Sequence, residues 1–192
     1  MKKYIFCIWI LLTLICSVQA QHKKPTFKFN SINSIGLLSG EMQNKFTFQT
    51  INGLQYKSLF AGVGAAFDNY GYHSIPVFMD LRKTFGHSHW QPFVYVDGGI
   101  NLPLLSNDLE NNWANTYKIQ NTFYGEAGFG VNRKLNRILQ FNFSMGYSYK
   151  HFSYIQYTTD YYNMYFQPSS NSTQYDFYYR RISIKTGLQF QF

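Results

Sequence analysis

The chain is short of charge, of cysteine and of the residues that favour helices, and each shortage argues against a class of protein. Charged residues make up 14% of its 192 positions, against roughly 25% in an ordinary soluble domain. Aromatic residues reach 20%, which argues against disorder, because disordered chains are rich in charge and poor in aromatic residues. Alanine, leucine and glutamate are scarce, so we do not expect a mainly helical soluble fold.

Both cysteines, Cys7 and Cys16, lie in the first twenty residues. This segment also has a basic start, an apolar run over residues 4–15 and a small-x-small end over residues 18–20, which are the three regions of a secretory signal peptide. The run is shorter than the roughly 20 residues that span a bilayer as a helix. We therefore expect a signal peptide over residues 1–20 and a single domain over residues 21–192 that has no disulfide and no cysteine ligand.

The net charge of +8 comes from basic residues scattered along the chain, without a dense cluster. An exported protein with this pattern is not expected to bind nucleic acid. The positive sum is compatible with contact to acidic lipid headgroups.

The rest of the chain shows a two-residue alternation of apolar and polar side chains, which is typical of strands. In the last such segment Ile182, Ile184 and Leu188 share one face, while Ser183 and Lys185 share the other. We predict eight strands, near residues 30–39, 45–52, 58–67, 74–82, 92–102, 122–132, 139–149 and 182–192.

The predicted connections differ in length. Asn52-Gly53 predicts a tight hairpin between the second and third strands, and the links at 86–90 and 133–137 are short. Residues 103–121 and 151–177 are expected to be long loops. Pro76 donates no ladder hydrogen bond and counts against a strand there, but a bulge or a strand end could accommodate it, so we keep the predicted strand. Eight strands place both termini on the side of the short turns, and ten strands remain an alternative.

The two faces of these strands indicate which side meets lipid. A soluble barrel or sandwich would carry many Lys and Glu residues on its polar face, whereas this polar face is mostly Gly, Ser, Asn and Gln. Small residues there suit the narrow lumen of an eight-stranded barrel, as at Gly62, Gly64, Gly128, Gly130 and Gly146. The apolar face is rich in aromatic residues. We therefore predict an all-β fold, a closed antiparallel transmembrane β-barrel with its apolar face in lipid.

With its signal-like start, its amphipathic strands and its terminal segment 187–192, the chain resembles the small outer-membrane β-barrel proteins of Gram-negative bacteria. Its Tyr- and Asn-rich composition is more like the members from Bacteroidota. The resemblance covers roughly residues 27–192, and it implies a place in the outer membrane. It also implies that Phe190 and Phe192 form the C-terminal signal that the barrel-assembly machinery reads.

Charged residues on the predicted inner face form the first candidate site. Three acids and three bases balance there, and mutual pairing is expected because an unpaired charge in a narrow lumen is costly. A salt-bridged plug is one interpretation and a polar conduit for protons or small solutes is the other. The residues are Asp80, Arg82, Asp97, Glu126, Arg181 and Lys185.

The aromatic stretch 147–179 forms the second candidate site. Some of its rings are expected in the girdle at the membrane interface and the others on a loop surface that contacts an extracellular ligand. The residues singled out are Tyr147, Tyr149, Tyr154, Tyr157 and Tyr178.

One pattern hints at an enzyme. His151 and Ser153 resemble the His-x-Ser of some outer-membrane lipid A deacylases, but Tyr154 stands where those enzymes have Asn, and no Glu follows. Asp160 or Asp176 would then have to orient the histidine.

Metal and cofactor sites are not predicted. His73, His87 and His89 lack a third ligand nearby, and Gly62-x-Gly64 precedes no helix that could bind a dinucleotide. The sequence as a whole predicts a non-enzymatic outer-membrane barrel with a structural or surface-interaction role, with outer-membrane lipids and the assembly machinery as partners. A narrow channel is the alternative, and a lipid A-modifying enzyme that uses His151 and Ser153 is the remaining one.

Overall fold

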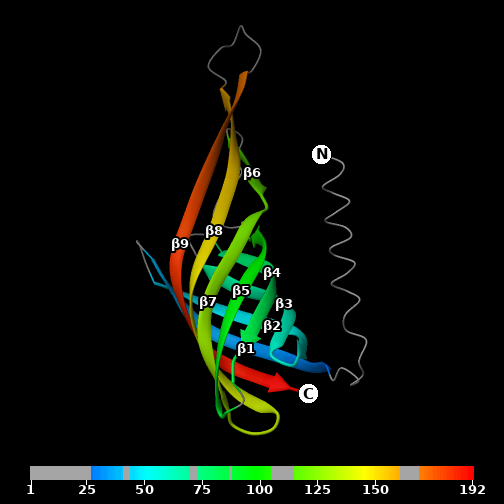
Figure 1. Cartoon of the computed structure of the whole chain (residues 1–192). Coiled ribbons are helices and arrows are strands. Elements are labelled where there is room, and N and C mark those ends of the chain that lie inside the picture. Colours follow the sequence, from blue (N-terminus) through cyan, green and yellow to red (C-terminus); the bar gives the residue numbers. More distant parts are fainter. Residues whose placement is uncertain (1–26, 41–43, 70–72, 87, 105–114, 161–168) are drawn as a thin grey trace, which may run out of the picture.

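The computed structural model describes residues 27–40, 44–69, 73–86, 88–104, 115–160 and 169–192, so the expected signal peptide lies outside the described residues. Over these ranges, no helix is long and apolar enough to cross a membrane. The described chain forms nine strands in a single antiparallel sheet (Figure 1). They are β1 (Phe27–Ser39), β2 (Lys45–Tyr56), β3 (Leu59–Asn69), β4 (His73–Thr84), β5 (Trp90–Pro103), β6 (Asn115–Gln120), β7 (Thr122–Lys134), β8 (Leu139–Asp160) and β9 (Ser169–Gln191).

The sheet closes on itself, because β9 pairs both with β8 and with β1. Strands β6 and β7 lie end to end along the same side of β8. Gln120 pairs with Ser153 and Tyr124 with Lys150, so the β6–β7 side has one extra residue, which is a bulge around Asn121. The nine strands therefore occupy eight positions, and the predicted eight-stranded closed barrel is confirmed.

The strands are staggered around the barrel in one direction. Following cross-strand partners once around the ring from Phe27 leads back to β1 at Leu37, ten residues further along. This stagger tilts the strands against the barrel axis, as closure of a narrow eight-stranded barrel requires. The path runs through Tyr56, Leu59, Lys83, Val94, Phe129, Met145 and Ile184.

Burial alternates along each strand and confirms the predicted orientation. Outward side chains such as Met79 and Phe129 are 64% and 63% exposed, whereas the inward Asp80 and Ser183 are fully buried. Since successive side chains of a strand point to opposite faces, the apolar set covers the exterior and the polar set fills the lumen.

The predicted hairpin at Asn52-Gly53 is wrong. Both residues lie inside β2, where Asn52 pairs with Val63 and Gly53 with Gly62. A Cβ at Gly53 would lie 2.2 Å from the carbonyl oxygen of Ala61, so this glycine permits a close approach of two strands. The turn lies at residues 57–58, where Lys57 adopts a φ of 53°.

The strand predicted through Pro76 is confirmed, and it accommodates the proline without a bulge or a strand end. Pro76 lies inside β4 opposite Asn101 of β5. On the β3 side the pairing stops at Ala65–Val77 and resumes at Asp68–Ser74 without a change of register. The missing N–H interrupts the ladder locally, and the hydrogen bonds on either side keep the strand in place.

The long loops are shorter than predicted. Residues 151–160 and 169–177 continue β8 and β9, which pair as far as Asp160–Ser169. Within 103–121, residues 115–120 form β6. Figure 1 shows the β8–β9 pair rising well above the other strands. We call residues 151–160, 169–180 and β6 the extension.

Candidate functional site

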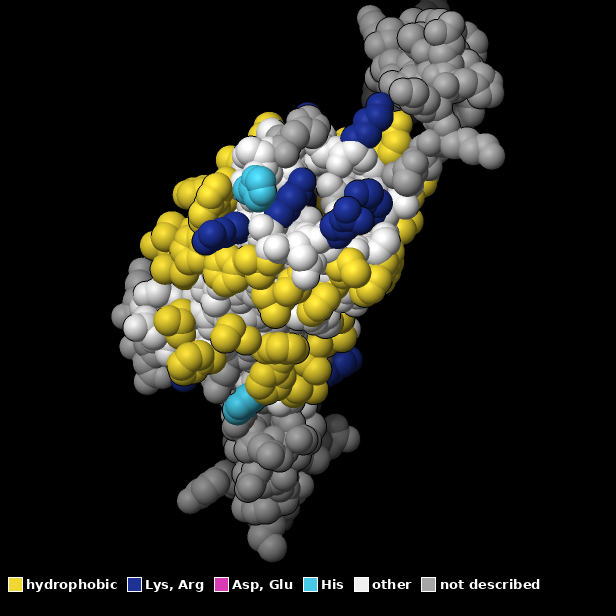
Figure 2. All heavy atoms as spheres, turned by 90° about the horizontal axis from the view of Figure 1, so that it is seen from below, with side chains coloured by type: hydrophobic (Ala, Val, Ile, Leu, Met, Phe, Trp, Pro, Cys, Tyr) yellow, Lys and Arg dark blue, Asp and Glu magenta, His cyan; other side chains and the backbone are white. Residues whose placement is uncertain are grey.

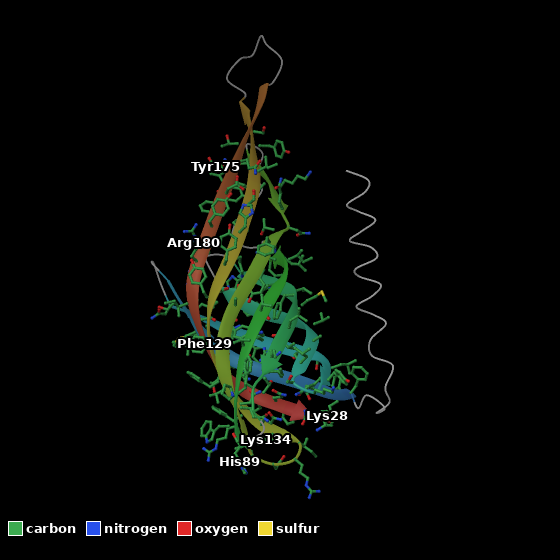
Figure 3. All side chains as sticks on the ribbon, in the orientation of Figure 1. Lys28, His89, Phe129, Lys134, Tyr175 and Arg180 are labelled. Carbon is green, nitrogen blue, oxygen red and sulfur yellow. The ribbon has the colours of Figure 1, made fainter. Side chains whose placement is uncertain are left out.

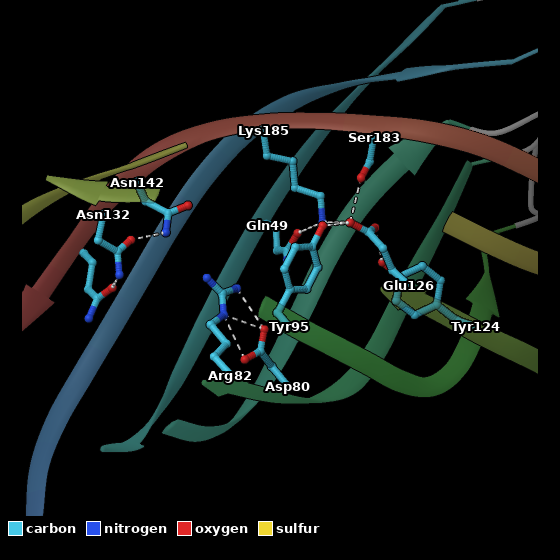
Figure 4. A network of polar contacts seen from close by, with 11 residues as sticks. Gln49, Asp80, Arg82, Tyr95, Tyr124, Glu126, Asn132, Asn142, Ser183 and Lys185 are labelled. Carbon is cyan, nitrogen blue, oxygen red and sulfur yellow. Dashed lines mark hydrogen bonds and ion pairs between the residues drawn. The ribbon is translucent and has the colours of Figure 1, made fainter. Parts of the chain in front are cut away.

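The centre of the lumen holds Glu126, a carboxylate that several strands contact (Figure 4). Its Oε1 accepts hydrogen bonds from Tyr95 Oη (2.6 Å) and Ser183 Oγ (2.7 Å) and pairs with Lys185 Nζ (2.7 Å). Tyr124 Oη donates to its Oε2 (3.0 Å). Glu126 is 3% exposed, so these donors replace the water that a buried carboxylate has lost.

A second group of charges lies on β4 and β5. The guanidinium of Arg82 holds Asp80, with its Nε 2.8 and 2.9 Å from the two carboxylate oxygens. Asp97 is the cross-strand partner of Asp80. Within the described part of the chain neither oxygen of Asp97 has a hydrogen-bond donor, although the side chain is 2% exposed.

The end of the lumen nearer the extension holds a pair that the sequence analysis missed. Lys150 Nζ lies 2.6 Å from Asp68 Oδ2 and donates to Ser74 Oγ (3.0 Å). Asp68 and Lys150 each lie one residue beyond a predicted strand end, at 67 and at 149. Extending the alternation by that one residue would have placed both on the inner face.

Amides and apolar side chains fill the remaining bore. At the opposite end Asn142 Nδ2 donates to Asn132 Oδ1 (2.6 Å), and Asn30 Nδ2 donates to Gln55 Oε1 (2.6 Å). A buried apolar cluster from β1, β2, β3, β4 and β7 fills another part of the bore. Its members are Ile32, Ile51, Phe60, Ala66, Phe78 and Tyr124.

All six charges singled out from the sequence are buried in the lumen. The structure brings together Asp80 with Arg82 and Glu126 with Lys185. Arg181 Nη1 donates to the carbonyl oxygen of Leu38 at 3.5 Å.

The extension stands beyond the barrel wall. β1 accompanies β9 only as far as Ile182, and β7 accompanies β8 only as far as Lys150. Above these points β6 pairs with residues 153–158 of β8 and makes the extension a three-stranded sheet. Figure 3 places Tyr175 in this part and Arg180 near its base.

Aromatic rings line the face of the extension that continues the lumen side. Tyr154 stacks on Tyr175 with ring centroids 5.0 Å apart and on Phe177 at 6.0 Å. Phe152 contacts Phe177 at 6.2 Å, and Tyr117 of β6 meets Tyr154 edge-on at 6.0 Å. Such cross-strand aromatic pairs stiffen the sheet of the extension.

The opposite face carries His151, Ser153 and Asp176. Hydrogen bonds from Ser153 and His151 hold the pKa of the Asp176 carboxyl below its usual range. The Nε2 of His151 lies 3.0 Å from Asp176 Oδ1, and its ring stacks on Tyr178 with centroids 4.7 Å apart. Asp176 is thus the acid beside the histidine, and the side chain of Asp160 lies outside the described residues. Ser153 is 1% exposed.

The remaining predicted aromatic residues fall at two levels. Tyr147 is outward on the barrel wall and 53% exposed, and Tyr149 stacks on Tyr178 at 6.4 Å where the wall meets the extension. Tyr157 is 37% exposed, higher on β8.

Phe190 lies at the end of β9 and Phe192 directly follows this strand. Phe192 exchanges backbone hydrogen bonds with Phe29 (2.8 and 3.1 Å).

The end with the short turns is basic. Figure 2 shows Lys, Arg and His side chains there and no Asp or Glu, and Figure 3 labels Lys28, His89 and Lys134 at this end. Short turns mark the periplasmic side of outer-membrane barrels. The described basic residues of these turns and strand ends are Lys28, Lys57, Lys83, Arg133, Lys134 and Arg137.

The two described histidines that were considered as metal ligands lie at opposite ends of the barrel. His73 begins β4 and His89 lies in the turn before β5, while His87 lies outside the described residues. Over the described ranges, no group of three or more His, Cys, Asp or Glu side chains could hold a metal ion.

Comparison with known proteins identifies the fold. No family model matches the chain, and no curated protein does. Among solved structures, the outer membrane protein OprG from Pseudomonas aeruginosa is similar, with a TM-score of 0.54 and 12% identity over 88% of this chain and 97% of that one. Neisserial surface protein A has a TM-score of 0.53 and 13% identity over 86% and 97%.

A major outer membrane protein from Thermus thermophilus has a TM-score of 0.50 and 14% identity over 87% of this chain and 100% of that one. At these identities the likeness concerns the fold. A closed sheet with an apolar exterior and a polar lumen satisfies every backbone group in lipid. The chain therefore has the fold of an integral outer-membrane β-barrel protein of eight strands.

Proposed function

We propose that this barrel is a non-enzymatic anchor that presents the extension to an extracellular ligand. The observation that carries this proposal is the continuation of β8 and β9 beyond the barrel, from His151–Tyr178 to Asp160–Ser169. A preformed sheet loses little conformational entropy on binding, and exposed tyrosines provide contact area with a polar tip. Tyr175 and Tyr178 are 38% and 60% exposed.

The filled lumen favours this role over a conduit. Three ion pairs and a buried cluster of apolar side chains occupy the bore. Ion movement would require breaking buried pairs, each at a cost of several kcal/mol. We expect no ion current from the purified protein in planar bilayers, and a steady current would favour the channel alternative.

The geometry around His151 favours a structural clamp over a nucleophile. In a Ser-His-Asp triad the histidine lies between the serine and the carboxylate. Here His151 and Ser153 both hydrogen-bond to Asp176, which lies between them. Ser153→Ala is expected to leave the lipid A of the host membrane unchanged.

The recognition role is tested with cells that display the full chain on a panel of immobilised polysaccharides and extracellular-matrix proteins. A variant with Tyr175→Ser and Tyr178→Ser is expected to lose at least about tenfold in binding, because aromatic anchors dominate such contacts. The matched control is Tyr147→Ser, which removes an exposed tyrosine from the barrel wall. Equal binding by all three chains, or no binding by the wild type, contradicts the proposal.

Two further partners belong to this proposal. The basic periplasmic end suits the acidic headgroups of outer-membrane lipids. The strand end with Phe190 and Phe192 suits the barrel-assembly machinery, and Phe192→Ala is expected to slow insertion in cells.

A further inference from the structure

A cluster of polar side chains interrupts the apolar exterior of the barrel on β1 and β2. On β1 the buried Ile32 and Ser34 point inward, so Ser31 and Asn33 point toward lipid. On β2 the buried Gln49 and Ile51 point inward in the same way, so Thr50 and Asn52 also face lipid. Asn33 pairs with Thr50 and Ser31 with Asn52, so the four side chains are contiguous. We call them the midplane patch.

The patch lies midway between the two edges of the apolar band. On β1 it is flanked by Phe27 and Phe29 on one side and by Ile35 and Leu37 on the other. On β2 the flanking residues are Phe46 and Phe48 on one side and Leu54 and Tyr56 on the other. At this depth lipid offers acyl chains alone, and neither water nor headgroups can satisfy an amide.

The corresponding outward positions on the other described strands are apolar except Thr186 of β9, whose hydroxyl donates to the carbonyl oxygen of Asn142 at 3.4 Å. β4 carries Val77 and Met79 there, β5 carries Val96, and β8 carries Phe143 and Met145. Within the described part of the chain, the one side-chain hydrogen bond inside the patch runs from Asn33 Nδ2 to Ser31 Oγ, at 3.4 Å. The two asparagines thus keep hydrogen-bonding groups that face hydrocarbon.

We infer that the midplane patch is the contact through which two copies of this chain associate in the membrane. A two-fold axis along the membrane normal keeps every residue at its own depth, so the patch of one copy meets the same patch of the other. Ser, Thr and Asn side chains both donate and accept hydrogen bonds, so the patch is complementary to itself. Beside it, Ala61 and Ala65 of β3 are small enough to let the two walls approach closely.

The first experiment is disulfide cross-linking of the full chain in membranes, with Cys7 and Cys16 replaced by Ser. Asn33→Cys and Asn52→Cys are introduced one at a time. At least one of them is expected to give a covalent dimer on oxidation, several-fold more than Val96→Cys. Val96 is the matched control, because it lies on β5, four strands from β1 and three from β2, and its outward side chain is 51% exposed. Equal cross-linking from all three positions, or none, overturns the inference.

The second experiment measures the dimer fraction of purified protein in lipid nanodiscs or vesicles. The double variant Asn33→Leu, Asn52→Leu should remain a folded barrel, since both side chains face lipid, while its dimerisation constant should fall about tenfold or more. Val96→Leu, on the remote strand β5, should leave the constant unchanged. A monomeric wild type, or a double variant that associates as strongly, contradicts the inference. Neither result bears on ligand recognition by the extension.

Discussion

At the scale of single residues, the stability of the barrel depends on buried carboxylates in the lumen that each pair with a basic side chain. They are Asp68, Asp80 and Glu126. Glu126 accepts from two tyrosines and a serine and pairs with Lys185. Removing one partner of such a network leaves a buried charge without compensation, which costs more than the pair itself contributes.

We expect Glu126→Ala to lower the free energy of unfolding by about 3–5 kcal/mol, because Lys185 then remains buried without its carboxylate. Urea denaturation of the barrel refolded in detergent measures this. The double variant Glu126→Gln, Lys185→Met should recover much of the loss. The single variants Glu126→Gln and Lys185→Met are measured beside it. If the loss of free energy in the double variant equals the sum of these two single losses, the residues do not act as a pair.

Asp80 and Asp97 provide a matched comparison on neighbouring strands. Asp80→Asn should cost at least about 1 kcal/mol more than Asp97→Asn. The reason is that Asp80 holds Arg82, whereas no described donor reaches Asp97. The same denaturation assay decides this, and a larger loss for Asp97→Asn would indicate a partner outside the described residues.

At the scale of elements, the β2–β3 turn shows where sequence signals mislead. Asn-Gly usually indicates a hairpin, but here Gly53 is needed because the backbone of Ala61 occupies the space of its Cβ. The turn uses Lys57 in a left-handed conformation that glycine and asparagine adopt more easily.

Substitutions at these two sites should therefore have opposite effects. Lys57→Asn should raise the free energy of unfolding by up to about 1 kcal/mol, because it relieves the backbone conformation. Gly53→Ala should lower it, because the two strands would have to move apart. Thermal unfolding of both variants is the measurement, and a destabilising Lys57→Asn would contradict this account.

The extension is the element whose stability should depend on pH. The folded pKa of Asp176 lies below its usual value, so the ionised carboxylate stabilises the extension above the unfolded pKa of about 3.9. That contribution is lost as the pH falls through the folded pKa. The ring resonances of Tyr178 in NMR spectra should show this acid transition, and Asp176→Asn should remove it.

The sequence alone predicted the barrel class, the count of eight strands and the orientation of the two faces, because alternation repeats on most strands. It missed the continuation of β8 and β9, since residues 151–160 alternate less cleanly and aromatic residues occupy both faces. The pairing of particular charges also required the structure. Glu126 of β7 and Lys185 of β9 lie on either side of β8, and the curvature of the barrel brings their side chains together inside the lumen. No spacing in the sequence encodes this contact.

At the scale of the whole molecule, the closed sheet and the extension are separable. The eight pairings that close the barrel involve residues up to Lys150 of β8 and from Arg181 of β9 onward. A chain in which residues 155–174 are replaced by a short turn should still form the barrel. On detergent gels it should migrate differently before and after boiling, as the full chain should. A loss of that difference would mean that the extension is required for closure.

The meeting of β9 with β1 has a consequence for biogenesis. Asn30 and Gln191 are neighbours in the ring although they lie at opposite ends of the barrel sequence. The last strand of the barrel sequence, β9, is therefore the one that gives β1 its second neighbour. Before β9 pairs, β1 and β8 each have an unpaired strand edge. A chain that lacks β9 therefore cannot close the barrel, and we expect periplasmic proteases to degrade it.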